Sequence, residues 1–157
     1  MSNELPCMTL KVIGIVRNKV KQPPKTHHSW EKIVSELVLD NDLTEALDGL
    51  EEFSHLIVLF WMHNINPTNK IQAKIHPKRN QKLPLVGFFA TRSPNRPNPL
   101  GKATVRLLKR QGNTLTVQGL DAIDGTPIVD IKPYIPGYDS VTDARTPTWI
   151  NQTNKPC

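Results

Sequence analysis

Two arginines and two asparagines lie within seven residues of a proline-rich segment, GFFATRSPNRPNPLG, residues 87–101. Each proline fixes its own φ and restricts the preceding residue to extended geometry, so the segment is predicted to be a rigid loop. Its donors are Arg92, Asn95, Arg96 and Asn98, whose planar groups suit carboxylates, phosphates or base edges. A stiff loop holds such donors with little ordering cost, which favours a ligand site. The alternative is a proline-stiffened connection whose polar groups only meet water.

Carboxylates form a second group in GLDAIDGTPIVDIKPYIP, within a chain that is otherwise basic. Asp124 and Gly125 are a common tight-turn pair, so Asp124 has a structural interpretation beside a functional one. Asp130 is predicted to lie in a strand, where a carboxylate needs a donor such as Lys132 or an arginine of the proline segment. Together with Asp121, these carboxylates beside a basic loop would suit a zwitterionic or cationic small molecule.

Histidine and cysteine offer weaker signals. His63 and Asn64 end an apolar run, FWMHN, where a histidine is more often structural than catalytic. The pair His27–His28 could contact RNA but lacks partners for a metal site, and no HExxH motif occurs, so no metal is predicted. Cys7 and Cys157 lie near the two ends with no metal-binding spacing, and reduced thiols are expected.

The bulk composition indicates one basic domain spanning residues 1–157. Twenty Lys and Arg against fourteen Asp and Glu give a net charge of +6, which favours polyanions such as nucleic acid; a basic protein without such a partner is the alternative. No apolar run could span a bilayer and no signal pattern begins the chain, so a cytoplasmic protein without a membrane partner is expected. Neither GxGxxG nor GxxxxGK[ST] occurs.

The elements that must position these groups are mostly strands. One α-helix is predicted over 42–53, with Asp42 as N-cap and Glu45 completing a capping box. Gly14 is expected to mark a bulge or a close backbone approach. Alternating or β-branched patterns predict strands at 9–17, 34–40, 55–63, 84–92, 103–110, 114–120 and 127–136. Six to seven strands without strand–helix–strand alternation predict a mainly β fold, a single-domain β-barrel that is closed or nearly closed.

Three segments, FSHLIVLFWMH, GFFATRSPNRPNPLG and LDAIDGTPIVDIKPYIP, closely resemble the TrmO family, also called YaeB-like, TsaA-like or VirR-like, between Ile13 and Ile135. The resemblance implies a β-barrel tRNA methyltransferase that uses S-adenosylmethionine and works as a homodimer with the cofactor near the subunit interface. Its expected reaction methylates N6 of N6-threonylcarbamoyladenosine, next to the anticodon at position 37. Compared with longer members, the chain is expected to be a short form without the C-terminal domain, and it carries RNKVK where an RSPYK-like run is common.

The resemblance also implies site residues. The cofactor would be held by Pro24, Lys25, Thr26, His63, Asn64, Arg92, Lys102, Ala103, Asp124, Gly125, Thr126 and Pro127. For the chemistry, Asp130 or Asp121 could remove the N6 proton, or Arg92 and Arg96 could stabilise a deprotonated ureido group. The expected phosphate contacts are Lys19, Lys21, Lys25, Lys74, Lys78 and Arg79. A non-catalytic barrel that binds RNA or a small ligand is the alternative function.

Overall fold

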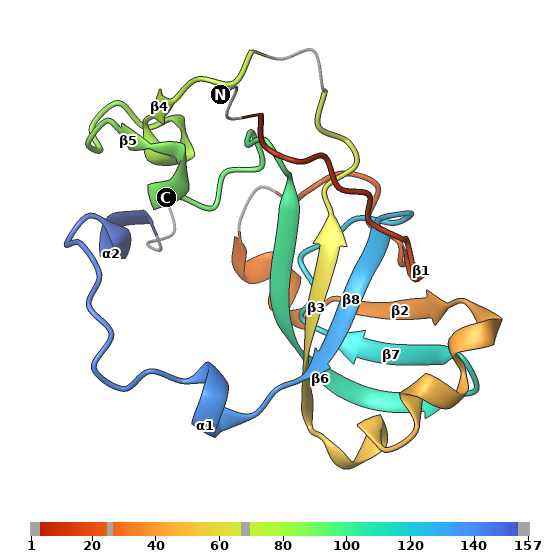
Figure 1. The fold of residues 1–157 in the computed structure, drawn as a ribbon. Coiled ribbons are helices and arrows are strands. Elements are labelled where there is room, and N and C mark those ends of the chain that lie inside the picture. Colours follow the sequence, from red (N-terminus) through yellow and green to blue (C-terminus); the bar gives the residue numbers. More distant parts are fainter. Residues whose placement is uncertain (1–3, 25–26, 67–69, 154–157) are drawn as a thin grey trace.

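The computed structural model describes the backbone of residues 4–24, 27–66 and 70–153, in which a barrel of six strands closes (Figure 1). Around the barrel the order is β1, β2, β7, β6, β3, β8, and neighbouring strands are antiparallel. Their bounds are β1 Gly14–Arg17, β2 Val34–Leu39, β3 His55–Trp61, β6 Leu100–Gln111, β7 Thr114–Gln118 and β8 Pro127–Pro133. The predicted mainly β fold and closed barrel are confirmed.

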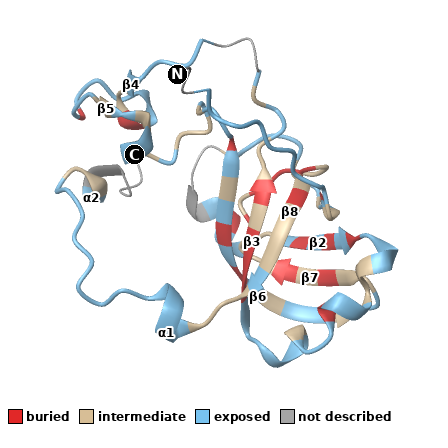
Figure 2. Ribbon diagram, in the orientation of Figure 1, coloured by how far each residue is buried: buried red, intermediate tan, exposed pale blue. Residues whose placement is uncertain are grey.

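Alternating side chains fill the barrel interior. In β2, Ser35, Leu37 and Leu39 are buried while their neighbours are exposed, and in β7 Leu115 and Val117 are fully buried (Figure 2). This period of two is what a pleated strand with one face on a core requires. Because the interior is packed with apolar side chains, polar sites on this protein must lie on the outer face or at the rims of the barrel.

The first strand is shorter than predicted and begins at Gly14. A Cβ atom at Gly14 would lie 2.6 Å from the carbonyl oxygen of Val38 on the neighbouring strand β2. Such a distance is sterically forbidden, so the expected close backbone approach is confirmed and glycine is required there.

The predicted α-helix over 42–53 is wrong, because this segment forms three separate 3-10 turns: η2 Asn41–Leu43, η3 Glu45–Leu47 and η4 Leu50–Glu52. Asp40, not Asp42, caps the first turn by accepting from the Asp42 amide at 3.1 Å. Gly49 then takes a left-handed φ of 88°, which interrupts any continuous helix. Arg110 of β6 holds the turns through Thr44 O at 2.9 Å and the Asp48 carboxylate at 2.8 Å.

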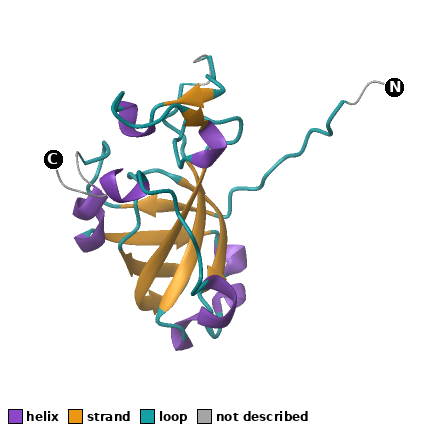
Figure 3. Ribbon diagram, turned by 90° about the vertical axis from the view of Figure 1, so that its left-hand side faces the viewer, coloured by secondary structure: helices purple, strands orange, loops and turns teal. Residues whose placement is uncertain are grey.

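The predicted strand over 84–92 is also largely wrong. It is reduced to β5, Val86–Gly87, which pairs with β4, Lys74–Ile75, before η6, Phe88–Ala90, turns the chain. Thr91 Oγ1 donates to Phe88 O at 2.8 Å and stabilises this turn. The β4–β5 pair, with η5 (Pro77–Arg79) between its strands, belongs to residues 70–90, here called the excursion, which lies beyond one end of the barrel (Figure 3).

After β8 the chain runs through α1, Pro136–Asp139, and ends its described part in α2, Ile150–Thr153. Strand β8 ends at Pro133, before the predicted bound at residue 136, and α1 begins at Pro136. Across the described segments, every helix is too short or too polar to cross a membrane.

Candidate active site

The proline loop, residues 91–99, connects the excursion to β6 and contains Arg92 and Arg96. Its backbone is held by local hydrogen bonds, from Ser93 N to Thr91 Oγ1 at 3.2 Å and from Arg96 N to Pro94 O at 2.9 Å. Asn98 O accepts from Leu100 N at 2.7 Å, where β6 begins. These contacts and the prolines agree with the predicted rigid loop.

A cavity of about 510 Å³ lies on the outer face of β6. Four predicted site residues line it: Arg92, Lys102, Ala103 and Asp121. We call it the mixed cavity, because cations and carboxylates both line it. Its residues are Trp30, Glu31, His55, Arg92, Lys102, Ala103, Thr104, Arg106, Gln118, Gly119 and Asp121. Trp30 and Glu31 come from η1, His27–Lys32, and Asp121 follows β7.

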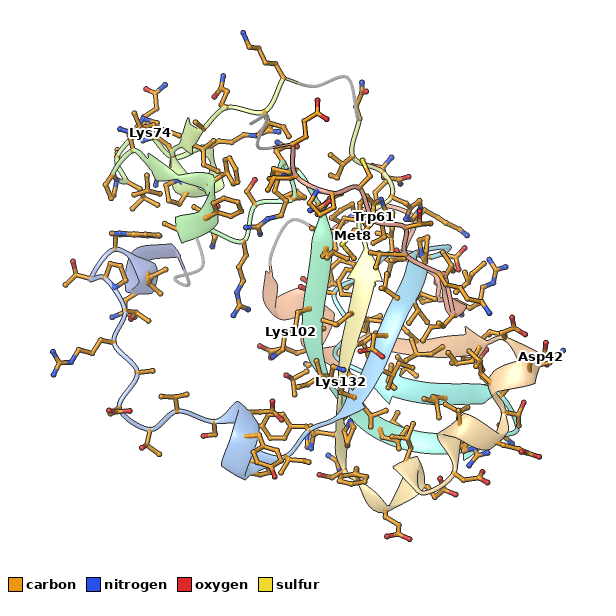
Figure 4. The ribbon with its side chains drawn as sticks, viewed as in Figure 1. Met8, Asp42, Trp61, Lys74, Lys102 and Lys132 are labelled. Carbon is orange, nitrogen blue, oxygen red and sulfur yellow. The ribbon has the colours of Figure 1, made fainter. Side chains whose placement is uncertain are left out.

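The strand period explains how β6 lines the mixed cavity. Lys102, Thr104 and Arg106 are exposed along one face, whereas Ala103 is buried and pairs with Val58 of β3. Lys102 Nζ donates to Thr104 Oγ1 at 2.9 Å. Figure 4 shows Lys102 on β6 and Lys132 on β8, on either side of β3. Ala103 therefore has only its backbone and methyl group to offer a ligand, while its two neighbours offer polar side chains.

A second cavity, of about 610 Å³, lies between the end of β3, the excursion and the proline loop. We call it the basic cavity. Its residues are Trp61, His63, Ile65, Asn66, Lys70, Ile71, Gln72, Ile75, Asn95, Arg96, Pro97 and Pro99. It brings together the predicted His63 and Arg96. The Arg96 guanidinium lies 5.9 Å from the Phe89 ring centroid and donates to Thr91 O at 3.4 Å.

The predicted residues 124–127 lie in neither cavity; a turn is formed at residues 124–126, and Pro127 begins β8. Asp124 accepts from Asn18 N at 3.1 Å and pairs with Lys21, while Gly125 has a left-handed φ of 79°. The buried Thr126 donates its hydroxyl to Ile123 O at 2.7 Å. The hydrogen bond from Lys21, followed by that from the Asn18 amide, lowers the pKa of Asp124. These contacts support the tight-turn interpretation, and cofactor binding by Asp124, Gly125, Thr126 and Pro127 stays a prediction.

Asp130 also lies outside both cavities. Its carboxylate is 2.8 Å from Lys132 Nζ, and its side chain is 41% exposed on the outer face of β8, beside Leu59 of β3. Of the donors that the sequence offered it, the structure selects Lys132, whose pKa is raised by the hydrogen bond to Asp130. Arg96 is placed with the basic cavity instead.

Comparison with known protein families identifies the family of this chain. A family model described as the tRNA-methyltransferase O N-terminal domain matches residues 15–140. The chain belongs to the TrmO family. That assignment confirms the resemblance carried by the three segments quoted above.

Similarity to individual proteins supports the assignment to the TrmO family. A probable S-adenosyl-L-methionine-binding protein of Archaeoglobus fulgidus is 40% identical over 147 residues, covering 92% of this chain and 38% of the relative. The tRNA (adenine(37)-N6)-methyltransferase of Mus musculus is 42% identical over 120 residues, covering 76% of this chain and 27% of the enzyme. The crystal structure of TrmO from Pseudomonas aeruginosa superposes with a TM-score of 0.71 at 32% identity, covering 89% of this chain and 62% of that one.

The remaining predicted residues of this TrmO chain are scattered. Asn64 is exposed after β3, and Pro24 is half-buried at the edge of a described segment. Lys25 and Thr26 lie outside the described residues. Within the described ranges, no cluster of three or more His, Cys, Asp or Glu could hold a metal ion.

Sequence reasoning missed several lining residues of the TrmO cavities. Arg106 could have been found, because the period of two places it on the same face of β6 as Lys102. Trp30 and Glu31 carried no such signal. They are positioned by tertiary contacts, including the bond from Gln118 Nε2 to Glu31 O at 3.1 Å. Lys70 lies on the excursion, and no local pattern predicts that this segment lines a cavity together with the proline loop.

Proposed function

We propose that this chain transfers a methyl group from S-adenosylmethionine to N6 of an adenosine in tRNA, with N6-threonylcarbamoyladenosine at position 37 as its substrate. The observation that best supports this proposal is the composition of the mixed cavity. Arg92, Lys102 and Ala103, which are expected to hold the cofactor, line it together with Asp121, a candidate for the catalytic base. The family supports the reaction class, since relatives are named as S-adenosyl-L-methionine-binding proteins and as a tRNA (adenine(37)-N6)-methyltransferase.

The residues of the mixed cavity fit the cofactor. S-adenosylmethionine carries a carboxylate beside an ammonium and a sulfonium, and it supplies an electrophilic methyl group when bound. Arg92 and Arg106 can bind the carboxylate, while Glu31 offers negative charge to the ammonium. Trp30 is 7% exposed and gives the cavity an apolar wall. A volume of about 510 Å³ is within the range of small-molecule sites.

Asp121 is the better candidate for the base. A urea-like N6 is a poor nucleophile while it keeps its proton, so a group that accepts this proton would assist the transfer, and a carboxylate at the site can serve as that base. Asp121 lines the mixed cavity, whereas Asp130 is paired with Lys132 elsewhere on the barrel. In this proposal Asp121 would accept the N6 proton as the N6–methyl bond forms, and S-adenosylmethionine held in the cavity would supply the methyl group and leave as S-adenosylhomocysteine. Arg92, in the same cavity, stabilises negative charge on the ureido group.

The excursion supplies phosphate contacts. Lys74, Lys78 and Arg79 are exposed on it, and the described residues place no carboxylate in an ion pair with any of them. Lys78 and Arg79 have left-handed φ values of 52° and 57°, a costly conformation for two consecutive non-glycine residues. Lys19 and Lys21 lie after β1, where Lys21 is already bound to Asp124; Lys25 lies outside the described residues.

A homodimer and a cytoplasmic location belong to the same proposal. Large apolar side chains, including Phe89, Tyr138 and Val141, are exposed outside the barrel and could be covered by a second copy. Sedimentation should then give a mass near twice 17.7 kDa.

Labelled methyl transfer tests the function. The chain is given methyl-labelled S-adenosylmethionine and tRNA with or without the threonylcarbamoyl group, and label is expected only in the modified tRNA. Label in unmodified tRNA alone would keep the enzyme class but exclude the substrate. Tight tRNA binding with no label in either RNA, and no heat when S-adenosylmethionine is titrated, would favour the non-catalytic barrel.

A further inference from the structure

The basic cavity differs in charge from the mixed cavity. Lys70 and Arg96 line it, and none of its lining residues is acidic. The whole segment from Phe53 to Leu120, which supplies all the lining, contains no aspartate or glutamate. A concave surface lined by one sign of charge focuses positive potential and favours an anionic ligand.

Arg96 is presented to this cavity with unused donor capacity. Its guanidinium carries five N–H donors, and among the described residues its one hydrogen bond is the 3.4 Å contact to Thr91 O. The Phe89 ring supports it from one side at 5.9 Å. The half-buried side chain lies in the proline loop, so it is oriented before any ligand arrives.

Trp61 forms an aromatic wall of the same cavity. It ends β3, where it pairs with Leu100, and the next amide, Met62 N, donates to Pro99 O at 2.8 Å. Figure 4 shows Trp61 at the end of β3 nearer the excursion. A half-buried indole on a fixed strand, next to Ile65 and Ile75, is a suitable stacking surface for a planar base.

We infer that the basic cavity binds the anionic group of the nucleotide being methylated, through Arg96 and Lys70, with its base against Trp61. The inference rests on the proposed function and assigns the substrate a place separate from the cofactor. Arg92 and Arg96 are four residues apart, so their Cα atoms lie within about 14 Å of each other. The proline loop thus contributes to both cavities, and the proposal requires a nucleotide in the basic cavity to extend its N6 toward the mixed cavity.

Two groups could be the anion: the threonyl carboxylate attached to N6, or an RNA phosphate. Three anticodon stem-loop RNAs distinguish them. One carries threonylcarbamoyladenosine, the second carries the same group with its carboxylate converted to a carboxamide, and the third carries plain adenosine. Each is titrated against the wild-type chain, Arg96→Gln and Lys109→Gln, a matched control that removes one exposed cation from β6 outside both cavities.

Arg96→Gln is expected to weaken binding by about tenfold relative to Lys109→Gln, the size of a lost charge-assisted hydrogen bond. A loss confined to the carboxylate RNA identifies the threonyl group, and an equal loss for all three identifies a phosphate. Trp61→Leu should weaken all three RNAs. Thermal unfolding checks that each variant is folded.

Equal affinities of Arg96→Gln and Lys109→Gln for all three RNAs would overturn the inference. A loss of S-adenosylmethionine binding in Arg96→Gln would also overturn it, by giving the cavity to the cofactor. The proposed function fails separately: a wild-type chain that transfers no methyl group refutes the enzyme, even if the Arg96 effect on RNA binding persists.

Discussion

The two cavities differ in charge, although the proline loop contributes an arginine to each of them. The mixed cavity has Arg92 with Glu31 and Asp121, whereas the basic cavity has Arg96 with Lys70 and no carboxylate. A ligand with charges of both signs suits the first, and an anion suits the second. Arg92 and Arg96 lie four residues apart and have the same side chain, so the groups that surround each of them decide which ligand it can bind.

The largest loss of activity should come from replacing Asp121. Asp121→Asn removes the proposed base and should lower kcat by about a hundredfold or more, the usual contribution of general base catalysis, with little change in cofactor affinity. Asp130→Asn is the control, because its partner is Lys132 outside the cavities. Single-turnover methyl transfer measures both; a larger loss in Asp130→Asn would reverse the assignment.

The two arginines provide the next test. Arg92→Gln should weaken S-adenosylmethionine binding by about tenfold, because a charge-assisted hydrogen bond in the mixed cavity is lost. Arg96→Gln should leave that affinity unchanged. Calorimetric titration compares the variants, and equal losses would mean that the two cavities act as one site.

A third prediction concerns the excursion beside the basic cavity. Lys78→Asn with Arg79→Asn removes two cations and keeps residues that tolerate left-handed backbone. The slope of log K for tRNA against log salt should become shallower by about 1.4 to 1.8. The control, Lys11→Asn with Lys109→Asn, removes the same charge elsewhere, and an identical change in slope there would show that only net charge matters.

The smallest effect is expected for Asp124, which lies in a turn outside both cavities and should affect thermal stability only. Because its pKa is lowered in the folded state, its contribution to stability is present above the ordinary Asp pKa of about 3.9 and is lost as pH falls through the lower folded value. Asp124→Asn should lower Tm by about 2 °C or less at pH 7 and by less still at pH 3. A large loss of cofactor binding in this variant would instead restore the cofactor role.

Much of the barrel could be predicted from the sequence, because alternation in β6 and β7 and the apolar run of β3 are local patterns. The helix over 42–53 could not be excluded locally, since its apolar spacing was helical. The left-handed Gly49 and the contacts from Arg110 decide its form. Residues 84–92 had strand composition but only β4 as a partner.

The sequence predicted many of the residues of the candidate site, but it did not predict which of them line the same cavity. Arg92, Lys102 and Asp121 do converge in the mixed cavity, whereas His63 lines the basic cavity. Asp124 lies in neither cavity and is paired with Lys21. No sequence pattern reports on which side of a loop each side chain lies. The single-domain organisation stays a prediction.

A crystal structure with S-adenosylhomocysteine would show which of the two cavities holds the cofactor. We expect the ligand in the mixed cavity, in contact with Arg92 and beside Asp121, with the basic cavity left to RNA. A ligand bound between His63 and Arg96 in the basic cavity would contradict it.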